Sequence, residues 1–149
     1  MKKKKSKKLS ASNNAAQLNF PTLFIDRCAW SNRLGEALKD AGITFIPHHD
    51  KFLPNCPDDE WLPVVGKEKW IVITRDKNIR RKPNELQAFK ENNVIAIVLS
   101  SGSGSQASAS DTAELLVRLY PKLMRKIQAA KPPIMLTVTL MGTISSVKF

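Results

Sequence analysis

The chain has 149 residues, 42% of them hydrophobic and 25% charged, which is typical of one soluble globular domain. Its formal net charge is +11 at pH 7, and six lysines lie among the first eight residues, so the rest still carries +5 (11 less 6). Such a basic protein favours polyanions, for example nucleic acid or an anionic membrane surface. No stretch approaches the ~20 apolar residues of a membrane helix, which excludes a spanning segment.

The first part of the chain is predicted to be a tail. Residues 1–19 are rich in lysine and lack hydrophobic periodicity, so we expect them to be disordered and to contact phosphate without specificity. Residues 20–149 are predicted to form one domain. No apolar segment of an export signal follows the lysines, and Cys28 and Cys56 form no C-x-x-C pair. We therefore expect a cytoplasmic protein with reduced thiols.

Two apolar runs flank the first predicted helix. The run Thr22–Asp26 predicts a strand that ends in an acid. Between Leu34 and Ala41, apolar residues recur at the spacing i, i+3, i+4, i+7, which is typical of one helix face. Ser31 is a suitable N-cap, and Gly42 a suitable end. The short run Ile43–Ile46 predicts the second strand.

A polar segment leads to the third strand. Residues 47–60, "PHHDKFLPNCPDDE", are predicted to be a loop too irregular for a strand or helix. A short helix follows, and we expect Pro63 in its first turn, where backbone N–H groups lack helical partners. This places the helix start near Asp58 or Asp59. The β-forming run Trp70–Thr74 predicts the third strand.

A helix and a fully apolar strand come next. Pro83 is expected to begin a helix that the Asn92–Asn93 pair ends. The run "VIAIVL", residues 94–99, predicts the fourth strand. A Gly–Ser-rich segment, residues 100–110, then predicts a flexible loop.

The last part of the chain predicts a long helix and a hairpin. The helix is expected to begin at Asp111, with Glu114 at the spacing of a capping box. Pro121 is expected to kink it. The final residues predict a hairpin around Met141–Gly142.

This order of strands and helices predicts an α/β fold. We expect a three-layer α/β/α domain with a mostly parallel central sheet of about four strands and a C-terminal hairpin. The continuous apolar runs suit strands that are buried on both faces. Right-handed crossovers would bring the carboxyl ends of these strands to one edge, where ligands of such sheets bind near the point of reversed strand order.

Several acids are predicted at this edge. Asp26 ends the first strand, Asp76 follows the third, and Asp58 opens the helix between them. Singly, each acid also fits a structural role, as a turn residue or an N-cap. Together they would repel one another unless a cation neutralised them, and carboxylate oxygens select Mg²⁺ or Mn²⁺. Such ions serve phosphodiester hydrolysis. Further acids lie nearby in the chain: Asp50, Asp59 and Glu60.

Basic residues accompany the acids. The candidate phosphate-binding residues are Arg27, Arg75, Arg80 and Arg81. A guanidinium matches phosphate geometry with two hydrogen bonds. The alternative is that these arginines are solvated surface charges that pair with nearby acids.

Other kinds of site are less well supported. The sequence His48–His49–Asp50 lacks the i, i+4 spacing of helical metal ligands, and adjacent histidines in extended chain point apart. Ser100 and the two cysteines have no His–acid relay for nucleophilic catalysis. The Gly–Ser segment contains neither G-x-x-x-x-G-K-[ST] nor G-x-G-x-x-G, so it does not predict a nucleotide-binding loop.

The sequence motifs "FIDRC", "LGEALKDAG", "PDDEWLPVVGKEKW" and "IVITRDKNIRRKPNE" together resemble a known family. They are similar to the PIN-like domains of VapC-type toxins, in the branch with D-E-E-W-L and T-R-D patterns, from about Phe24 to Gly142. The resemblance implies a PIN-like fold, and it implies that Asp26, Asp58 and Asp76 bind metal. The family gathers about four acids, for which Asp59 and Glu85 are the further candidates here.

These observations lead to a functional prediction with an alternative. The resemblance implies a ribonuclease that uses Mg²⁺ or Mn²⁺ to hydrolyse RNA, often as the toxin of a toxin–antitoxin pair. It also makes a cognate antitoxin protein and a homodimer candidate partners. The alternative is a non-catalytic nucleic-acid-binding module with the same fold, because only three acids fall on clear motif positions. A protein-interaction role beside an antitoxin is compatible with catalysis.

Overall fold

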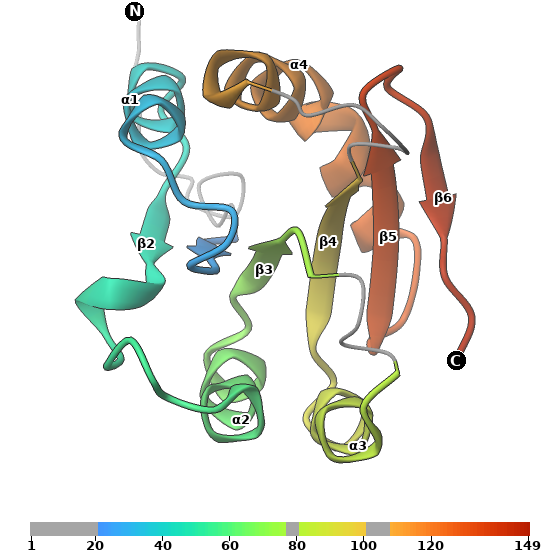
Figure 1. Cartoon of the computed structure of the whole chain (residues 1–149). Helices are drawn as coiled ribbons and strands as arrows, with labels where there is room; N and C mark the ends of the chain where they lie inside the picture. The colour runs from blue at the N-terminus through green and yellow to red at the C-terminus, as the bar shows by residue number, and fades with distance from the viewer. Residues whose placement is uncertain (1–20, 77–80, 101–107) are drawn as a thin grey trace, which may run out of the picture.

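The computed structural model describes residues 21–76, 81–100 and 108–149. The predicted tail, residues 1–19, lies outside these ranges, as does most of the Gly–Ser segment. The described chain forms three layers, with a central sheet between two pairs of helices (Figure 1). No described helix is both long enough and apolar enough to cross a membrane.

The sheet has six strands in the order β2-β1-β3-β4-β5-β6. The strands are β1 (Leu23–Ile25), β2 (Phe45–Pro47), β3 (Ile71–Thr74), β4 (Ile95–Ser100), β5 (Ile134–Thr139) and β6 (Ile144–Ser146). Neighbouring strands are parallel from β2 to β5, and only β6 is antiparallel to its neighbour. The predicted C-terminal hairpin is confirmed, with Gly142 at a φ of +87° in its turn. Its first strand also joins the parallel sheet, so five strands rather than about four run parallel.

The strand order reverses between β1 and β3. Strand β1 pairs with β2 on one side and with β3 on the other, in a register that places Ile25 opposite Ile73. In open parallel sheets such a reversal leaves a crevice at the carboxyl ends of the two strands. The residues that follow β1 and β3 therefore stand beside one another at the expected ligand-binding edge.

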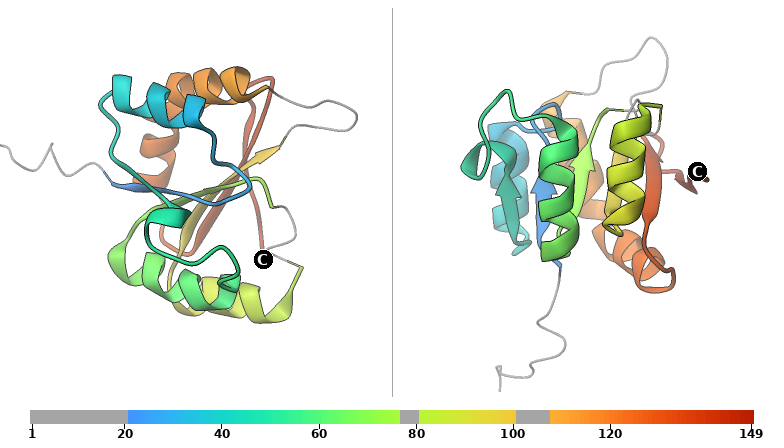
Figure 2. Two further views of the ribbon diagram at one scale, coloured as in Figure 1. Left: turned by 60° about the vertical axis from the view of Figure 1, so that its left-hand side comes forward. Right: turned by 90° about the horizontal axis from the view of Figure 1, so that it is seen from below.

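Two helices cover each face of the sheet (Figures 1 and 2). Helices α1 (Asn32–Asp40) and α4 (Ala109–Gln128) lie on one face, and α2 (Asp58–Glu68) and α3 (Pro83–Glu91) lie on the other. Successive residues of each central strand face opposite layers: Leu23 and Ile25 join the core under α1 and α4, whereas Phe24 joins the core under α2 and α3. Burial on both faces explains why these strands are apolar throughout.

Local signals set several helix ends as predicted. The Ser31 hydroxyl accepts a hydrogen bond from the Leu34 N–H at 3.0 Å, which confirms it as the N-cap of α1. Gly42 follows α1 with a φ of +74°, a conformation that glycine adopts without strain. Pro83 begins α3, as expected, and Asn93 beyond its end has a φ of +53°.

The start of the long helix α4 was predicted wrongly. It begins at Ala109 because the Ser108 hydroxyl accepts a hydrogen bond from the Asp111 N–H at 3.0 Å. Asp111 is therefore in the first turn, and the capping pair is Ser108 with Asp111, not Asp111 with Glu114. Pro121 lies inside the helix, which continues to Gln128. The kink at Pro121 stays a prediction.

Two expectations for the segment before β3 were also wrong. Residues 47–60 are not wholly irregular, because Pro47 ends β2 and His48–Asp50 form the 3-10 helix η2. Helix α2 does begin at Asp58, but Pro63 lies in its second turn. The missing N–H of Pro63 leaves only the carbonyl of exposed Asp59 without its helical donor, and solvent can supply a donor there.

Candidate active site

A cavity of about 530 Å³ opens at the carboxyl edge of the sheet. Its described lining consists of Asp26, Arg27, Cys28, Asp58, Arg75 and Asp76. Two of these acids follow β1 and β3 at the reversal of strand order, and the third begins α2. The structure thus brings together the three acids that the sequence placed at this edge.

Asp26 is held rigidly directly after β1. Only 6% of its surface is exposed. One carboxylate oxygen, Oδ1, accepts a hydrogen bond from the Arg27 N–H at 2.7 Å, and Oδ2 accepts one from the Thr74 hydroxyl at 2.8 Å. Its own N–H donates to the Ile73 carbonyl at 2.9 Å. These bonds fix both the backbone and the carboxylate of Asp26 against the end of β3.

Thr74 connects two of the acids. Its side chain is fully buried at the end of β3. The hydroxyl donates to Asp26 Oδ2 and accepts a hydrogen bond from the Asp76 N–H at 3.0 Å. Sequence reasoning missed this role, although the signal was present: Thr74 is a polar residue that ends an apolar strand two positions before an acid.

Asp58 begins α2 and faces the cavity. Its Oδ1 accepts a hydrogen bond from the Trp61 indole N–H at 2.9 Å. The explanation of Asp58 as an N-cap is wrong, because Pro57 holds that position and no side chain caps the helix. Burial raises the pKa of Asp58, the negative charge of Asp26 raises it further, and the Trp61 hydrogen bond acts in the opposite direction. Keeping Asp58 ionised in this site therefore costs free energy.

Glu85 comes to the same place from the first turn of α3. Its Oε2 lies 3.4 Å from the Lys82 ammonium, and its Oε1 is buried with no hydrogen-bond donor among the described residues. Burial raises the pKa of Glu85, and the negative charge of Asp58 raises it further. Sequence reasoning named Glu85 only as a candidate fourth acid, because its position depends on how α3 packs beside α2.

Three of these acids have the spacing of a cation site. Asp58, Asp76 and Glu85 each offer one carboxylate oxygen, and these oxygens lie within 4.8 Å of one another. Asp26 lies beside them, joined to Asp76 through Thr74. We call these four residues the acid cluster. Oxygen ligands of this kind suit hard cations such as Mg²⁺ and Mn²⁺.

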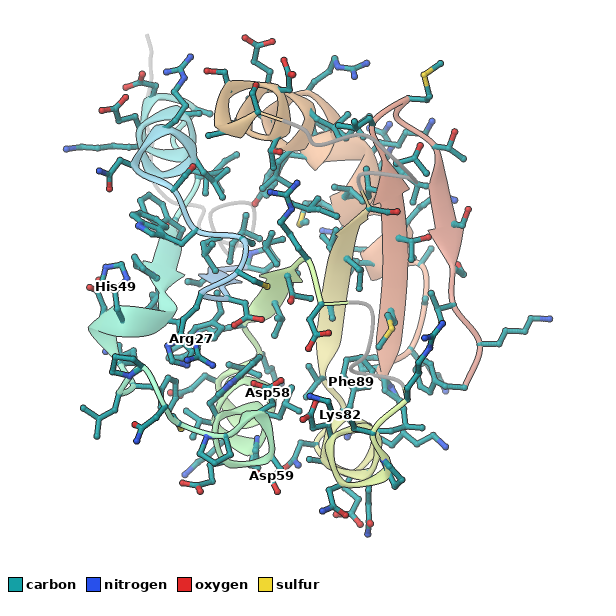
Figure 3. All side chains as sticks on the ribbon, in the orientation of Figure 1. Arg27, His49, Asp58, Asp59, Lys82 and Phe89 are labelled. Atoms are coloured by element: carbon teal, nitrogen blue, oxygen red, sulfur yellow. The ribbon has the colours of Figure 1, made fainter. Side chains whose placement is uncertain are left out.

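Asp59 lies outside the acid cluster. Its side chain is exposed and borders a neighbouring hollow, which it shares with Lys82 and with Glu85 of the acid cluster. Figure 3 shows Asp58 on the side of α2 nearer the sheet and Asp59 on the outer side of the helix. Consecutive residues of a helix are about 100° apart around its axis, which separates these two neighbouring carboxylates.

The predicted phosphate-binding arginines are distributed unevenly. Arg27 and Arg75 line the cavity, the first exposed and the second half-buried. Arg81 is exposed and is not among the residues of the cavity wall, and Arg80 lies outside the described residues. Lys82 is the cation nearest the acid cluster that the structure describes, through its pair with Glu85.

Cys28 also lines the cavity. Its sulfur accepts a hydrogen bond from the Arg75 N–H at 3.3 Å and lies 3.5 Å from Asp26 Oδ2. Burial raises the pKa of the Cys28 thiol, and the negative charge of Asp26 raises it further. A protonated thiol donates a weak hydrogen bond to Asp26 and is a poor nucleophile.

His48 lies behind the acid cluster in an aromatic pocket. Only 1% of its surface is exposed, and its ring packs against Phe24, Phe52 and Trp61 at centroid distances of 5.4–6.0 Å. Neither ring nitrogen has a hydrogen-bond partner in the part of the chain that the structure describes. His49 points elsewhere, to the surface beside Asp50. The two neighbouring rings thus lie in different surroundings, one buried and one exposed.

The burial of His48 predicts a pH-dependent stability. Burial lowers the pKa of His48, and the nearby Arg27 charge lowers it further. Below pH ~6.5 the unfolded chain therefore takes up a proton that the folded chain excludes, and stability falls as the pH falls from there toward the lowered pKa. Urea unfolding at about pH 7.5 and 5.5 should show a larger loss of stability for the wild type than for His48→Leu.

The neighbouring histidine gives a matched control for this measurement. His49→Leu should keep the wild-type pH dependence, because the His49 ring is on the surface. The acid cluster is the same in all three proteins, so it does not distinguish them in the comparison. Equal pH dependence of the wild type and His48→Leu would contradict the prediction.

Comparison with known proteins adds one finding. A family model described as a PIN-like domain matches residues 21–101, more than half of the chain. The matched segment contains every residue of the acid cluster and the first four strands of the sheet. No curated protein matches the chain.

Proposed function

Because the chain belongs to the family of PIN-like domains, which are commonly nucleases, we propose that it is a metal-dependent endoribonuclease. The observation that carries the proposal is the acid cluster: three carboxylate oxygens within 4.8 Å of one another, with Asp26 beside them. Carboxylates this close together repel one another, and a bound cation would relieve that repulsion.

The residues present fit a divalent cation. Asp58, Asp76 and Glu85 supply only oxygen atoms, and the buried Oε1 of Glu85 lacks a hydrogen-bond donor among the residues described. These three residues would hold Mg²⁺ or Mn²⁺, with Asp26 in the adjoining position. When bound, such an ion supplies polarisation of the phosphodiester and activation of a water molecule.

The protein's own groups would position the substrate. Arg27 and Arg75 line the cavity, and Arg75 also borders a hollow beside Ser100. Their guanidinium groups are the candidates to bind the phosphate. Asp26 cannot rotate, because Arg27 and Thr74 bind its two oxygens. Such fixed groups orient a phosphate without reorganising during the reaction.

The acid cluster favours catalysis over a non-catalytic binding module. The alternative was motivated by an acid missing from the motif positions. Glu85 supplies a fourth carboxylate next to Asp58, from a helix that the motif pattern alone did not place. A binding module would gain nothing from three carboxylates in the cavity wall and a fourth beside them, since without a cation they repel phosphate.

Cleavage assays with metal removal test this proposal. Purified protein is incubated with end-labelled RNA, or with DNA of the same sequence, in Mn²⁺, in Mg²⁺ or in EDTA. We expect internal cleavage of RNA with metal and none in EDTA. Asp26→Asn protein, purified in parallel, measures contaminating nuclease. Equal cleavage in EDTA, or equal cleavage by Asp26→Asn, would show that the acid cluster is not the active site.

We also propose that the protein acts as the toxin of a toxin–antitoxin pair, with a cognate antitoxin as partner. The support is the likeness of its motifs to the VapC-type toxins. A neighbouring reading frame that encodes a small DNA-binding protein would support this role, and an unrelated neighbour would count against it.

A further inference from the structure

A second cavity, of about 460 Å³, lies at the opposite edge of the sheet. It is bordered by the residues that follow α2 and α3 and by the segment that enters β5. The acid cluster lies at the other ends of the same two helices, at Asp58 and Glu85. Helix α2 has 11 residues, which separates the two sites by about 16 Å at the ~1.5 Å rise per residue.

The lining of this cavity is cationic and partly apolar. Its polar residues are Lys69, Lys131, Asn92 and Asn93, its apolar residues are Val65, Trp70, Ile95 and Pro132, and Gly66 of α2 also belongs to it. No acidic residue belongs to the described lining. Two lysines and a tryptophan in one lining favour an anion that carries a flat, apolar part.

The Trp70 ring is held in one plane. Its indole stacks on Phe24 at a centroid distance of 5.8 Å and an angle of 9°. The residue is half-buried and also lines the cavity. A pre-positioned aromatic surface of this kind binds a planar ring at a small entropic cost, and stacking on a nucleobase contributes ~1–3 kcal/mol.

Lys69 stands in a position that favours glycine. Its backbone is left-handed, with φ at 61° and ψ at 33°, which costs an ordinary residue about 1 kcal/mol. Its N–H donates to the Gly66 carbonyl, and the Trp70 N–H donates to the Val65 carbonyl, so the backbone alone ends α2. Glycine would end the helix as well. The need to end the helix therefore does not explain a lysine at position 69, whereas a role for its charged side chain would.

We propose that this second cavity binds a nucleoside monophosphate, with the base against Trp70 and the phosphate between Lys69 and Lys131. The Asn92 Nδ2 group already donates to the Ala88 carbonyl at 2.7 Å, so the Asn93 carboxamide and the Asn92 Oδ1 atom are the groups that would pair with the base edge. The volume falls in the range of ~300–1,000 Å³ that small-molecule sites occupy. The same chemistry describes a free mononucleotide and the phosphorylated end of an RNA. The proposal does not depend on catalysis at the acid cluster.

The three tryptophans of the chain allow each site to be observed separately. The Trp61 indole N–H binds Asp58 and reports on the acid cluster, whereas Trp70 reports on the second cavity. The ¹⁵N-labelled full chain in EDTA is titrated with AMP, with adenosine and with inorganic phosphate, and the indole signals are followed by NMR. Trp70→Phe assigns the Trp70 signal.

We expect AMP to shift the Trp70 signal and to leave the Trp61 signal in place. Adenosine and phosphate should each bind at least fivefold more weakly than AMP, because each lacks half of the contacts. Lys69→Gln should weaken AMP binding at least fivefold, and the matched variant Lys67→Gln, on the same helix but outside the cavity, should change it less than twofold. Lys69→Gly should weaken binding equally without lowering the urea midpoint, which separates lost binding from lost folding.

Short RNAs with and without a 5′-phosphate distinguish the two sources of the ligand. A Trp70 shift that requires the terminal phosphate identifies an RNA end, and a shift with AMP alone identifies a free nucleotide; both support the site. No Trp70 shift with millimolar AMP would overturn the proposal. A shift of Trp61 in place of Trp70, or a Trp70 shift with an acidic peptide but not with AMP, would overturn it as well.

Discussion

Asp58→Asn should lower metal-dependent RNA cleavage by at least ~10²–10³-fold, the size of effect expected when an active site loses one charged group. Asparagine keeps an oxygen that can accept the Trp61 indole hydrogen bond, so the start of α2 should stay in place. The substitution removes one of the negative charges of the acid cluster. Steady-state cleavage at saturating Mn²⁺ measures the loss, and calorimetric titration with Mn²⁺ measures the accompanying loss of metal affinity.

The same variant should be more stable than the wild type without metal. Burial and the Asp26 charge raise the pKa of Asp58, so at pH 7.5 its ionised form is less favourable in the folded protein than in the unfolded chain. A neutral asparagine removes this cost, which we expect to be about 0.5–1 kcal/mol for a half-buried group. Urea unfolding in EDTA checks the sign. Lower stability of Asp58→Asn would show that the carboxylate supports the fold in another way.

The adjacent residue provides the matched control. Asp59→Asn makes the same chemical change one position along the same helix, but its side chain is exposed outside the acid cluster. Cleavage by Asp59→Asn should stay within about threefold of the wild type, because a screened surface charge has little effect. Equal losses in the two variants would mean that general charge, rather than coordination by the acid cluster, controls activity.

The parts of the site that were predictable follow from local sequence. Asp26 and Asp76 could be placed because each follows a continuous apolar run, and parallel strands bring their carboxyl ends to one edge. Asp58 could be placed because Pro63 limits where α2 can begin, even though the proline lies one turn further in than expected. These signals involve residues within a few positions of one another.

The parts that could not be predicted depend on packing across the chain. Glu85 reaches Asp58 only because α3 packs beside α2 on one face of the sheet, which no local pattern specifies. The early start of α4 depends on Ser108, whose hydroxyl accepts a hydrogen bond from the Asp111 N–H. Nothing in the local sequence distinguishes this serine from the other serines of its segment. The sequence predicted that His48 lies in a loop. Its burial could not be predicted, because it depends on aromatic side chains from β1, from α2 and from the segment that follows His48.

Thr74→Val should impair both folding and cleavage, because Thr74 is the hydrogen-bond link between Asp26 and Asp76. Valine has nearly the same shape and suits a strand, so the change removes the hydroxyl and little else. Among the residues described, it leaves Asp26 Oδ2 with the weak Cys28 thiol as its donor, and it removes the Thr74 hydroxyl as the acceptor of the Asp76 N–H. Losing a buried partner in this way costs about 1–3 kcal/mol of stability.

Thr74→Val should lose more activity than its lower stability alone would explain. Residues that orient metal-binding carboxylates typically change metal affinity or activity by ~10–100-fold, and we expect Thr74→Val to lie in this range. Thr74→Ser keeps the hydroxyl and loses one buried methyl, so it should cost about 1 kcal/mol of stability but retain cleavage within a few-fold of the wild type. Mn²⁺ titrations and cleavage rates, measured well below each unfolding midpoint, separate the two variants. If the serine and valine variants cleave equally, the Thr74 hydroxyl does not position the acids, and the bonds of Asp26 to the Arg27 N–H and to the Ile73 carbonyl hold it in place.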